Sequence, residues 1–247
     1  MKLLSLGACL LFTAALAAHA ADKEAHWSYG GEHGPAKWGD MEHEFSECRL
    51  GREQSPIDIR DATVGKLPAL DFQYTASGAE VVNNGHTVQV NLADGGALNL
   101  DGVAYRLVQF HFHAPSEEKV NGKAFSMVVH MVHKNADGKL AVVAVLLKEG
   151  KASVALAPVF GKLPQAAGKQ FTLATKISPV DILPAERGYF SFIGSLTTPP
   201  CSEGVRWQVL KQPVEVSKAQ IAAFRKLYPM NARPVQPVNG RKIEQTG

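Results

Sequence analysis

Short runs of alternating apolar and polar residues dominate the chain from residue 80 onward. Successive side chains of a strand point to opposite faces, so this alternation predicts strands with one buried face. Leu140–Leu147 is apolar almost throughout, which predicts a strand buried on both faces. The strands expected from the pattern are Glu80–Val82, Thr87–Leu92, Ala97–Leu100, Tyr105–His113, Ala124–His133 and Leu140–Lys148.

Pairs of Asn or Asp with Gly separate these runs and favour the tight turns of β-hairpins. The pairs are Asn84-Gly85, Asp94-Gly95, Asp101-Gly102, Asn121-Gly122 and Asp137-Gly138. Residues 21–60 read as irregular, and the clearest helix is Ser217–Tyr228. Ser217 and Gln220 form a capping box there, and Ile221, Phe224 and Leu227 line one face. We therefore expect a β-dominated, mixed α+β fold, a single domain on a large, mostly antiparallel central sheet with a few short peripheral helices.

The first twenty residues predict a signal peptide. Lys2 precedes an apolar run over Leu3–Ala17, and Ala18-His19-Ala20 fits a small-residue cleavage site. The apolar run is too short to span a bilayer comfortably, and no later segment approaches the roughly 20 apolar residues that a transmembrane helix needs. We expect cleavage near Ala20, a mature domain over residues 21–247, and a periplasmic or secreted protein.

Charge and cysteine content limit the classes of partner and the cellular compartment that fit this chain. The chain has 26 basic and 23 acidic residues, a balance that favours neither nucleic acid nor an anionic membrane as partner. Cys9 lies in the predicted signal peptide, which leaves Cys48 and Cys201. An even number of cysteines in an oxidising compartment favours one disulfide, and the alternative is two free buried thiols.

Two histidine-rich runs carry the candidate chemistry. His111 and His113 alternate with Phe112 and so share one strand face, while His130 and His133 face opposite ways on the next predicted strand. A hairpin at Asn121-Gly122 would place the two strands side by side. His111, His113 and His130 can then converge, which excludes His133. Three neutral imidazoles leave zinc one open position, whereas each histidine alone could equally be an ordinary core or surface imidazole.

Gln109 lies two residues before His111 and on the same face. Its amide could accept the second N–H of a liganding imidazole and fix its tautomer, as metal sites usually require. The alternative is an ordinary strand glutamine.

Seven segments together resemble the α-class carbonic anhydrases of the bacterial, exported kind. They span the mature chain in the family's order: His26–Gly30, Gln54–Ile59, Asn83–His86, Gln109–His113, His130–His133, Ser195–Pro200 and Asn231–Pro237. The resemblance implies a zinc lyase that reversibly hydrates carbon dioxide to bicarbonate and a proton by attack of zinc-bound hydroxide, with side esterase activity. It also implies Zn²⁺ as cofactor, a small-molecule substrate, no nucleic-acid or membrane partner, and a monomer or homodimer.

The resemblance assigns roles to residues of this chain. His111, His113 and His130 would hold zinc. Thr197 would accept the proton of the hydroxide and donate its own to Glu117, and His86 would shuttle the released proton. Without the resemblance, His86 would be an exposed turn histidine. The pocket would comprise the water-ordering Tyr29, Asn84 and Gln89, the apolar Val132, Val142, Leu196, Val205 and Trp207, and Thr198.

The chain departs from the family's pattern at two positions. The family generally has glutamate two residues before the third ligand, where this chain has Val128, and many members have histidine where it has Glu118. Loss of a hydrogen-bond partner behind a ligand typically costs about 10–100-fold in metal affinity or activity. The departures leave open whether another group or a water supports His130, and they bear on zinc affinity and rate rather than on the ligand set.

Two other functions compete with the enzyme. A non-catalytic binding module of the same fold would characteristically lack one or more zinc ligands. A periplasmic zinc-buffering protein would not need the Thr197–Glu117 pair. The chain retains the three histidines together with Thr197, Glu117 and His86, which favours the enzyme.

Overall fold

The computed structural model describes residues 27–247. The predicted signal peptide over residues 1–20, the expected cleavage near Ala20 and the first residue of the segment His26–Gly30 lie outside the described residues.

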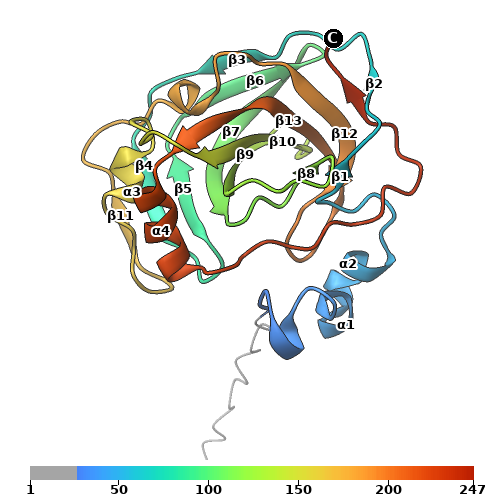
Figure 1. Cartoon of the computed structure of the whole chain (residues 1–247), viewed down its shortest axis with the longest axis horizontal. Coiled ribbons are helices and arrows are strands. Elements are labelled where there is room, and N and C mark those ends of the chain that lie inside the picture. The colour runs from blue at the N-terminus through green and yellow to red at the C-terminus, as the bar shows by residue number, and fades with distance from the viewer. Residues whose placement is uncertain (1–26) are drawn as a thin grey trace, which may run out of the picture.

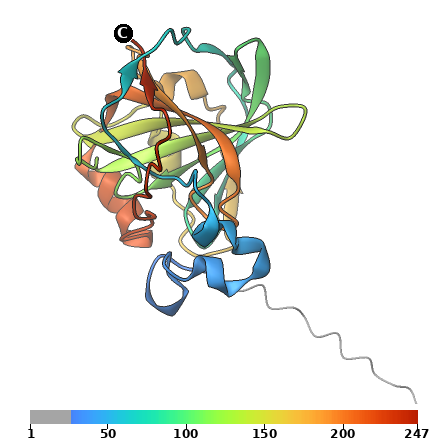
Figure 2. The ribbon, with the colours of Figure 1, turned by 90° about the vertical axis from the view of Figure 1, so that its right-hand side faces the viewer.

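A large curved sheet forms the body of the protein (Figures 1 and 2). Within the described residues it contains twelve strands, in the order β11-β4-β5-β7-β9-β10-β13-β12-β14-β2, with β6 pairing both β3 and β7. The strands are β2 Thr63–Val64, β3 Asp71–Tyr74, β4 Ala79–Asn83, β5 Val88–Leu92, β6 Gly96–Leu100, β7 Val103–His113, β9 Met127–Lys134, β10 Leu140–Glu149, β11 Gln170–Thr172, β12 Tyr189–Ser195, β13 Glu203–Val216 and β14 Glu244–Gln245.

Most neighbouring strands are antiparallel, as the sequence predicts. The exceptions within the described sheet are the parallel pairs β10–β13 and β14–β2. Asn84-Gly85, Asp101-Gly102 and Asp137-Gly138 connect the hairpins β4–β5, β6–β7 and β9–β10. The connection between β7 and β9 also contains a short strand, β8 Lys119–Val120, which pairs in parallel with β1 Asp58–Ile59.

The prediction of a hairpin at Asp94-Gly95 is wrong. β5 and β6 do not pair with each other, because both pair with the long strand β7: β6 along its first half and β5 along its second. The chain therefore advances along β7 at this turn instead of folding back on the preceding strand. A bulge in the β7–β9 pairing between Leu107 and Gln109 lies where the two halves of β7 meet.

The expectation of an irregular segment at residues 21–60 is also wrong in part. Its described portion contains η1 Gly31–His33, α1 Trp38–Met41, η2 His43–Phe45 and α2 Glu47–Leu50. Helices of three or four residues complete about one turn, which is too short to show a helical period. They gather at one end of the sheet (Figure 2).

The predicted helix is confirmed as α4 Lys218–Leu227, with Ser217 and Gln220 forming the capping box. Its buried residues Ile221 and Phe224 pack on the sheet beside Phe112. Two further short helices, α3 Ala157–Phe160 and η3 Pro179–Ile182, complete the periphery. No helix within residues 27–247 is long and apolar enough to cross a membrane.

Apolar residues pack on both faces of the central strands, so β10 is buried on both sides as predicted. Val143 and Val145 belong to the larger core cluster with Phe110 and Met131. Val142, Ala144 and Leu146 belong to the smaller cluster on the opposite face. That second face carries the candidate site.

A disulfide joins Cys48 in α2 to Cys201, with a sulfur–sulfur distance of 2.08 Å. The prediction of a bridge is confirmed, and the alternative of two free thiols is wrong. The bridge links the short helices to the segment after β12, which contains Thr197.

Candidate metal centre

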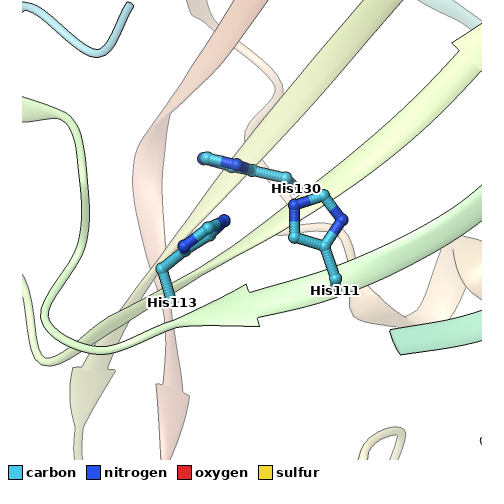
Figure 3. A group of neighbouring side chains, drawn as sticks. All are labelled: His111, His113 and His130. Atoms are coloured by element: carbon cyan, nitrogen blue, oxygen red, sulfur yellow. The ribbon is translucent and has the colours of Figure 1, made fainter. Parts of the chain in front are cut away.

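Three histidines converge on the face of the sheet opposite the larger core (Figure 3). His111 and His113 project from β7, and His130 projects from β9 directly opposite His111. Their ligand-capable nitrogens lie within 4.8 Å of one another, the one cluster of this kind in the part of the chain that the structure describes. Strand alternation and pairing therefore bring together the three residues that the sequence selected.

Each of the three imidazoles has one nitrogen bound by a protein oxygen. Nδ1 of His111 lies 2.8 Å from Gln109 Oε1, and Nδ1 of His113 lies 2.7 Å from the Asn231 carbonyl. Nε2 of His130 lies 2.9 Å from Glu118 Oε1. Carbonyl and carboxylate oxygens only accept hydrogen bonds, so the facing nitrogens carry the hydrogen and the other nitrogens present lone pairs to the centre.

The contact of Gln109 with His111 is the one expected from the sequence. The partners of the other two imidazoles were not identified from sequence. Asn231 lies in a segment that carries the family resemblance, but its backbone carbonyl gives no sequence signal. Glu118 was noted only as a departure from the family's pattern.

Burial favours neutral imidazoles at two of the three positions. It lowers the pKa of His111 to about 3, with a smaller effect from His130. It also lowers the pKa of His113 well below its usual value, and His130 and His111 act in the same direction. At His130, burial lowers the pKa, but Glu118 and Glu117 outweigh it and the net direction is upward. His113 Nε2 is buried without a hydrogen-bond partner among the described residues.

These observations fit a zinc site. Neutral imidazole nitrogens are zinc ligands, and three of them with the second nitrogen of each hydrogen-bonded is the arrangement that such sites use. His113 Nε2 is a buried polar atom without a hydrogen-bond partner, and a bound cation would satisfy it.

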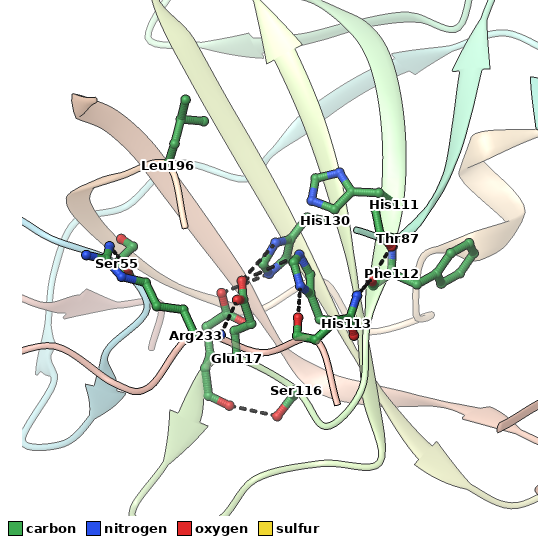
Figure 4. A network of polar contacts seen from close by, with 12 residues as sticks. Ser55, Thr87, His111, Phe112, His113, Ser116, Glu117, His130, Leu196 and Arg233 are labelled. Carbon is green, nitrogen blue, oxygen red and sulfur yellow. Dashed lines mark hydrogen bonds and ion pairs between the residues drawn. The ribbon is translucent and has the colours of Figure 1, made fainter. Parts of the chain in front are cut away.

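Glu117 is buried beside His113 and His130, near their centre-facing nitrogens (Figure 4). Its Oε1 accepts the backbone N–H of Arg233 at 2.8 Å, and its Oε2 lies 3.5 Å from His113 Nε2 and 3.8 Å from His130 Nδ1. Burial raises the pKa of Glu117 to about 7 against the lowering effect of His130, and a hydrogen bond from the Thr197 side chain also lowers it. Thr197 and Glu117, 80 residues apart in sequence, are therefore in contact as the resemblance implied.

A cavity of about 240 Å³ opens above the imidazoles. Of the predicted site residues, Glu117 and Val205 do not line it. Glu117 is buried beside His113 and His130, and Val205 is buried in the apolar cluster with Trp207. The cavity is lined by the three histidines, Thr197 and the predicted pocket residues Tyr29, Asn84, His86, Gln89, Gln109, Val132, Val142, Leu196, Thr198 and Trp207.

Strand register builds the apolar wall of the cavity. Val132 on β9 faces Val142 on β10, which faces Trp207 on β13. The three side chains form one row across three strands, and the Trp207 ring lies edge-on to His130 at 4.9 Å. The Trp207 indole N–H donates to the Ser195 carbonyl, which leaves its ring face apolar.

His86 lies in the turn after β4, stacked on Trp27 with ring centroids 3.6 Å apart. Asn84 Oδ1 accepts the backbone N–H groups of His86 and Thr87, which fixes this turn. Trp27 and Thr87 also line the cavity, although neither was predicted as a site residue. Tyr29 is partly buried nearby, and burial of its hydroxyl raises the pKa of that group well above the usual value.

His133 lies on the opposite face of β9, as alternation predicts. Both of its ring nitrogens have protein partners: Nε2 lies 2.6 Å from the Tyr74 hydroxyl and Nδ1 lies 3.2 Å from the Ala141 carbonyl. It takes no part in the metal centre.

Three inward-facing imidazoles under a small cavity with one polar and one apolar wall define a metalloenzyme site for a small substrate. The chain belongs to the carbonic anhydrase family, since the family model for eukaryotic-type carbonic anhydrases matches residues 33–247. Hydration of carbon dioxide is the general reaction of this family of metalloenzymes.

Individual relatives agree with this assignment. The chain is 42% identical to a carbonic anhydrase of Pectobacterium carotovorum over 239 residues, covering 96% of this chain and 98% of the relative. It is also 42% identical to a carbonic anhydrase of Neisseria gonorrhoeae, covering 96% and 92%. The α-carbonic anhydrase of Thermovibrio ammonificans, solved with the inhibitor sulfanilamide, superposes with a TM-score of 0.88 at 45% identity, covering 89% of this chain and 99% of that one.

Proposed function

We propose that this chain is an exported enzyme that catalyses the zinc-dependent, reversible hydration of carbon dioxide to bicarbonate and a proton. The observation that carries the proposal is the set of three inward-facing imidazole nitrogens, each fixed by a hydrogen bond on the far side of its ring. His111 and His113 would bind zinc through Nε2, and His130 would bind it through Nδ1. When bound, zinc would supply a nucleophile at neutral pH by lowering the pKa of a coordinated water to about 7.

Thr197 and Glu117 orient the attacking group. Glu117 is held by the Arg233 backbone N–H and accepts the hydrogen bond of Thr197. Because the Thr197 hydroxyl hydrogen is committed to Glu117, its oxygen can only accept on the cavity side. That polarity selects one orientation of a hydrogen donor in the cavity and aims its lone pair at the substrate. The backbone N–H of Thr197 is suited to stabilise the oxygen on which charge develops.

The apolar wall holds the substrate. Carbon dioxide is small and carries no net charge or hydrogen-bond donor, so contact with Val132, Val142 and Trp207 costs it little hydration. Leu196 adds to the same wall. The imidazoles and Thr197 lie on the polar side, so a molecule resting on this wall lies beside them.

His86 exports the proton of each cycle. An imidazole exchanges protons near neutral pH, and its place on the cavity lining gives it access to both the site and solvent. Tyr29, Asn84 and Gln89 line the same cavity and would order the intervening water. Asn84 Nδ2 donates a hydrogen bond to Gln89 Oε1 at 3.5 Å, which links two of these residues.

The remaining assignments concern the protein as a whole. The Cys48–Cys201 disulfide supports an oxidising compartment. With the predicted signal peptide over residues 1–20, we propose a periplasmic or secreted enzyme formed by residues 21–247, a monomer or homodimer. The activated zinc site would also give side esterase activity on activated esters.

A stopped-flow pH-indicator assay on protein carrying one zinc per chain tests the proposal. We expect hydration well above the buffer rate, and loss of that rate when zinc is removed by a chelator. Full zinc occupancy without any rate above buffer would contradict the enzyme and favour a binding module. Zinc that exchanges readily with chelator, again without hydration, would favour a zinc-buffering protein.

A further inference from the structure

In each of the three imidazoles, one ring nitrogen faces away from the metal centre and donates a hydrogen bond to the protein. The three rings differ in the group that accepts this bond. His111 and His113 donate to the neutral oxygens of Gln109 and Asn231, whereas His130 donates to the carboxylate of Glu118. A hydrogen bond to a carboxylate is stronger than one to a neutral oxygen and makes the imidazole more basic. The third imidazole therefore has a different electronic environment from the first two.

The strand itself offers His130 no such partner. The residue two positions before it on the same face is Val128, which lies opposite His113 on β7 and Leu146 on β10. Val128 is fully buried in the apolar cluster with Val142 and Ala144. The position at which the family generally has glutamate is thus filled by packing and cannot accept a hydrogen bond.

Glu118 reaches His130 from the connection between β7 and β8 instead. Its side chain is buried, and the Ser116 hydroxyl donates to its backbone carbonyl at 2.8 Å. The Phe125 N–H in turn donates to the Ser116 hydroxyl, and the next residue, Lys119, donates its N–H to the Ile57 carbonyl. This connection is fixed at both ends, so the carboxylate is held at the far nitrogen of His130.

We propose that Glu118 is the positioning residue of the third ligand in this chain, and that the supporting carboxylate has moved from strand position 128 to turn position 118. The proposal rests on the zinc centre proposed above. It explains both departures from the family pattern together, because Glu118 accepts the hydrogen bond from His130 that Val128 cannot accept. Glu118 touches neither substrate nor metal and acts through His130.

Zinc retention in Glu118 variants tests the proposal without relying on activity. We would measure zinc dissociation into excess chelator, and the melting temperature of each variant with and without zinc. Glu118→Ala should release zinc about 10–100-fold faster than the parent chain, the usual cost of losing such a partner. Glu118→Gln should show a smaller change, because its amide oxygen can still accept from His130.

The melting temperatures show whether Glu118 positions His130 for zinc or only contributes to the packing of the fold. Ligand binding stabilises a folded protein in proportion to the logarithm of its affinity, so a weaker zinc site narrows the gap between the two forms. We expect Glu118→Gln to narrow this gap while leaving the zinc-free melting temperature close to that of the parent chain. Glu186→Gln, which removes an exposed acid, is the matched control and should change neither quantity.

Moving the carboxylate back to the strand is the sharpest test. In the double variant Val128→Glu with Glu118→His, the acid returns to the position that the family generally uses. This variant should retain zinc more tightly than Glu118→His alone. A double variant no better than the single one, or zinc retention unchanged in both Glu118→Ala and Glu118→Gln, would overturn the proposal while leaving the zinc enzyme intact. A parent chain that binds no zinc would overturn both.

Discussion

His130 and His133 are three residues apart on β9 and both are buried, but only His130 belongs to the histidine cluster. His133 has a protein partner at each ring nitrogen, the Tyr74 hydroxyl and the Ala141 carbonyl. His130 has Glu118 at one nitrogen and turns the other toward His111 and His113. The difference shows that burial of a histidine does not mark a metal site. What marks it is a set of ring nitrogens from several histidines that converge within 4.8 Å of one another.

The largest expected effect comes from replacing one histidine on each face. His113→Ala removes one of the three proposed zinc ligands, so we expect zinc and carbon dioxide hydration to be lost while the fold remains. His133→Ala should retain zinc and hydration but lower the free energy of unfolding by about 1–3 kcal/mol, because it removes a fully buried side chain and its hydrogen bond with the Tyr74 hydroxyl. Zinc analysis, the hydration assay and urea unfolding compare the two. Loss of zinc from the His133 variant, with its fold intact, would break the distinction between the two faces.

A smaller loss of activity is expected when the three proposed ligands remain but Thr197, the proposed orienting residue, is removed. Thr197→Ala should lower kcat/KM by about 100-fold, the scale expected when a reacting group is misplaced, with zinc content unchanged. The hydration assay and zinc analysis of the same preparation check this. A variant that loses zinc in proportion to its activity would show that Thr197 supports the metal rather than the reaction.

His86 is a third kind of histidine, at the cavity mouth and stacked on Trp27. His86→Ala should lower turnover about 100-fold in weak buffer, the lower end of the usual range for loss of a proton-transfer group, and added imidazole should restore it. Zinc content and stability should stay close to those of the parent chain. Turnover that does not depend on buffer concentration in either protein would remove His86 from the proton path.

The smallest effect is a pH dependence of stability that belongs to the opposite face. Burial lowers the pKa of His133 to about 4, whereas an unfolded histidine titrates near 6.5. The unfolded chain therefore binds this proton first, and the stabilising contribution is present above pH about 6.5 and is lost as the pH falls toward 4. Its size is at most about 3 kcal/mol.

Unfolding of zinc-free protein between pH 4 and 7 measures that contribution. His133→Gln should flatten the dependence of the unfolding free energy on pH relative to the parent chain, because the difference between the two proteins isolates this histidine. Parallel curves for both would show that His133 is not the group responsible.

The sequence was most informative where one rule governed many residues. Alternation identified His111, His113 and His130 and excluded His133 without knowledge of the fold. It failed where pairing is not local. The hairpin expected at Asp94-Gly95 does not form, because β7 is long enough to pair with both β5 and β6. β13 was not predicted as a strand, since the bulge in its pairing with β10 and Pro213 interrupt its alternation.

The sequence by itself determined the convergence of His111, His113 and His130, the helix α4, the bridging cysteines and the family, because each depends on residue type at a short spacing or on motifs in a fixed order. Only the tertiary structure decided which group supports each ligand. The Asn231 carbonyl lies 118 residues from His113, and Glu118 reaches His130 from a turn rather than from its own strand. Such contacts depend on how distant segments pack, and no local spacing encodes them. The clearest case is the third ligand, where Val128 suggested a missing partner and the fold supplied Glu118.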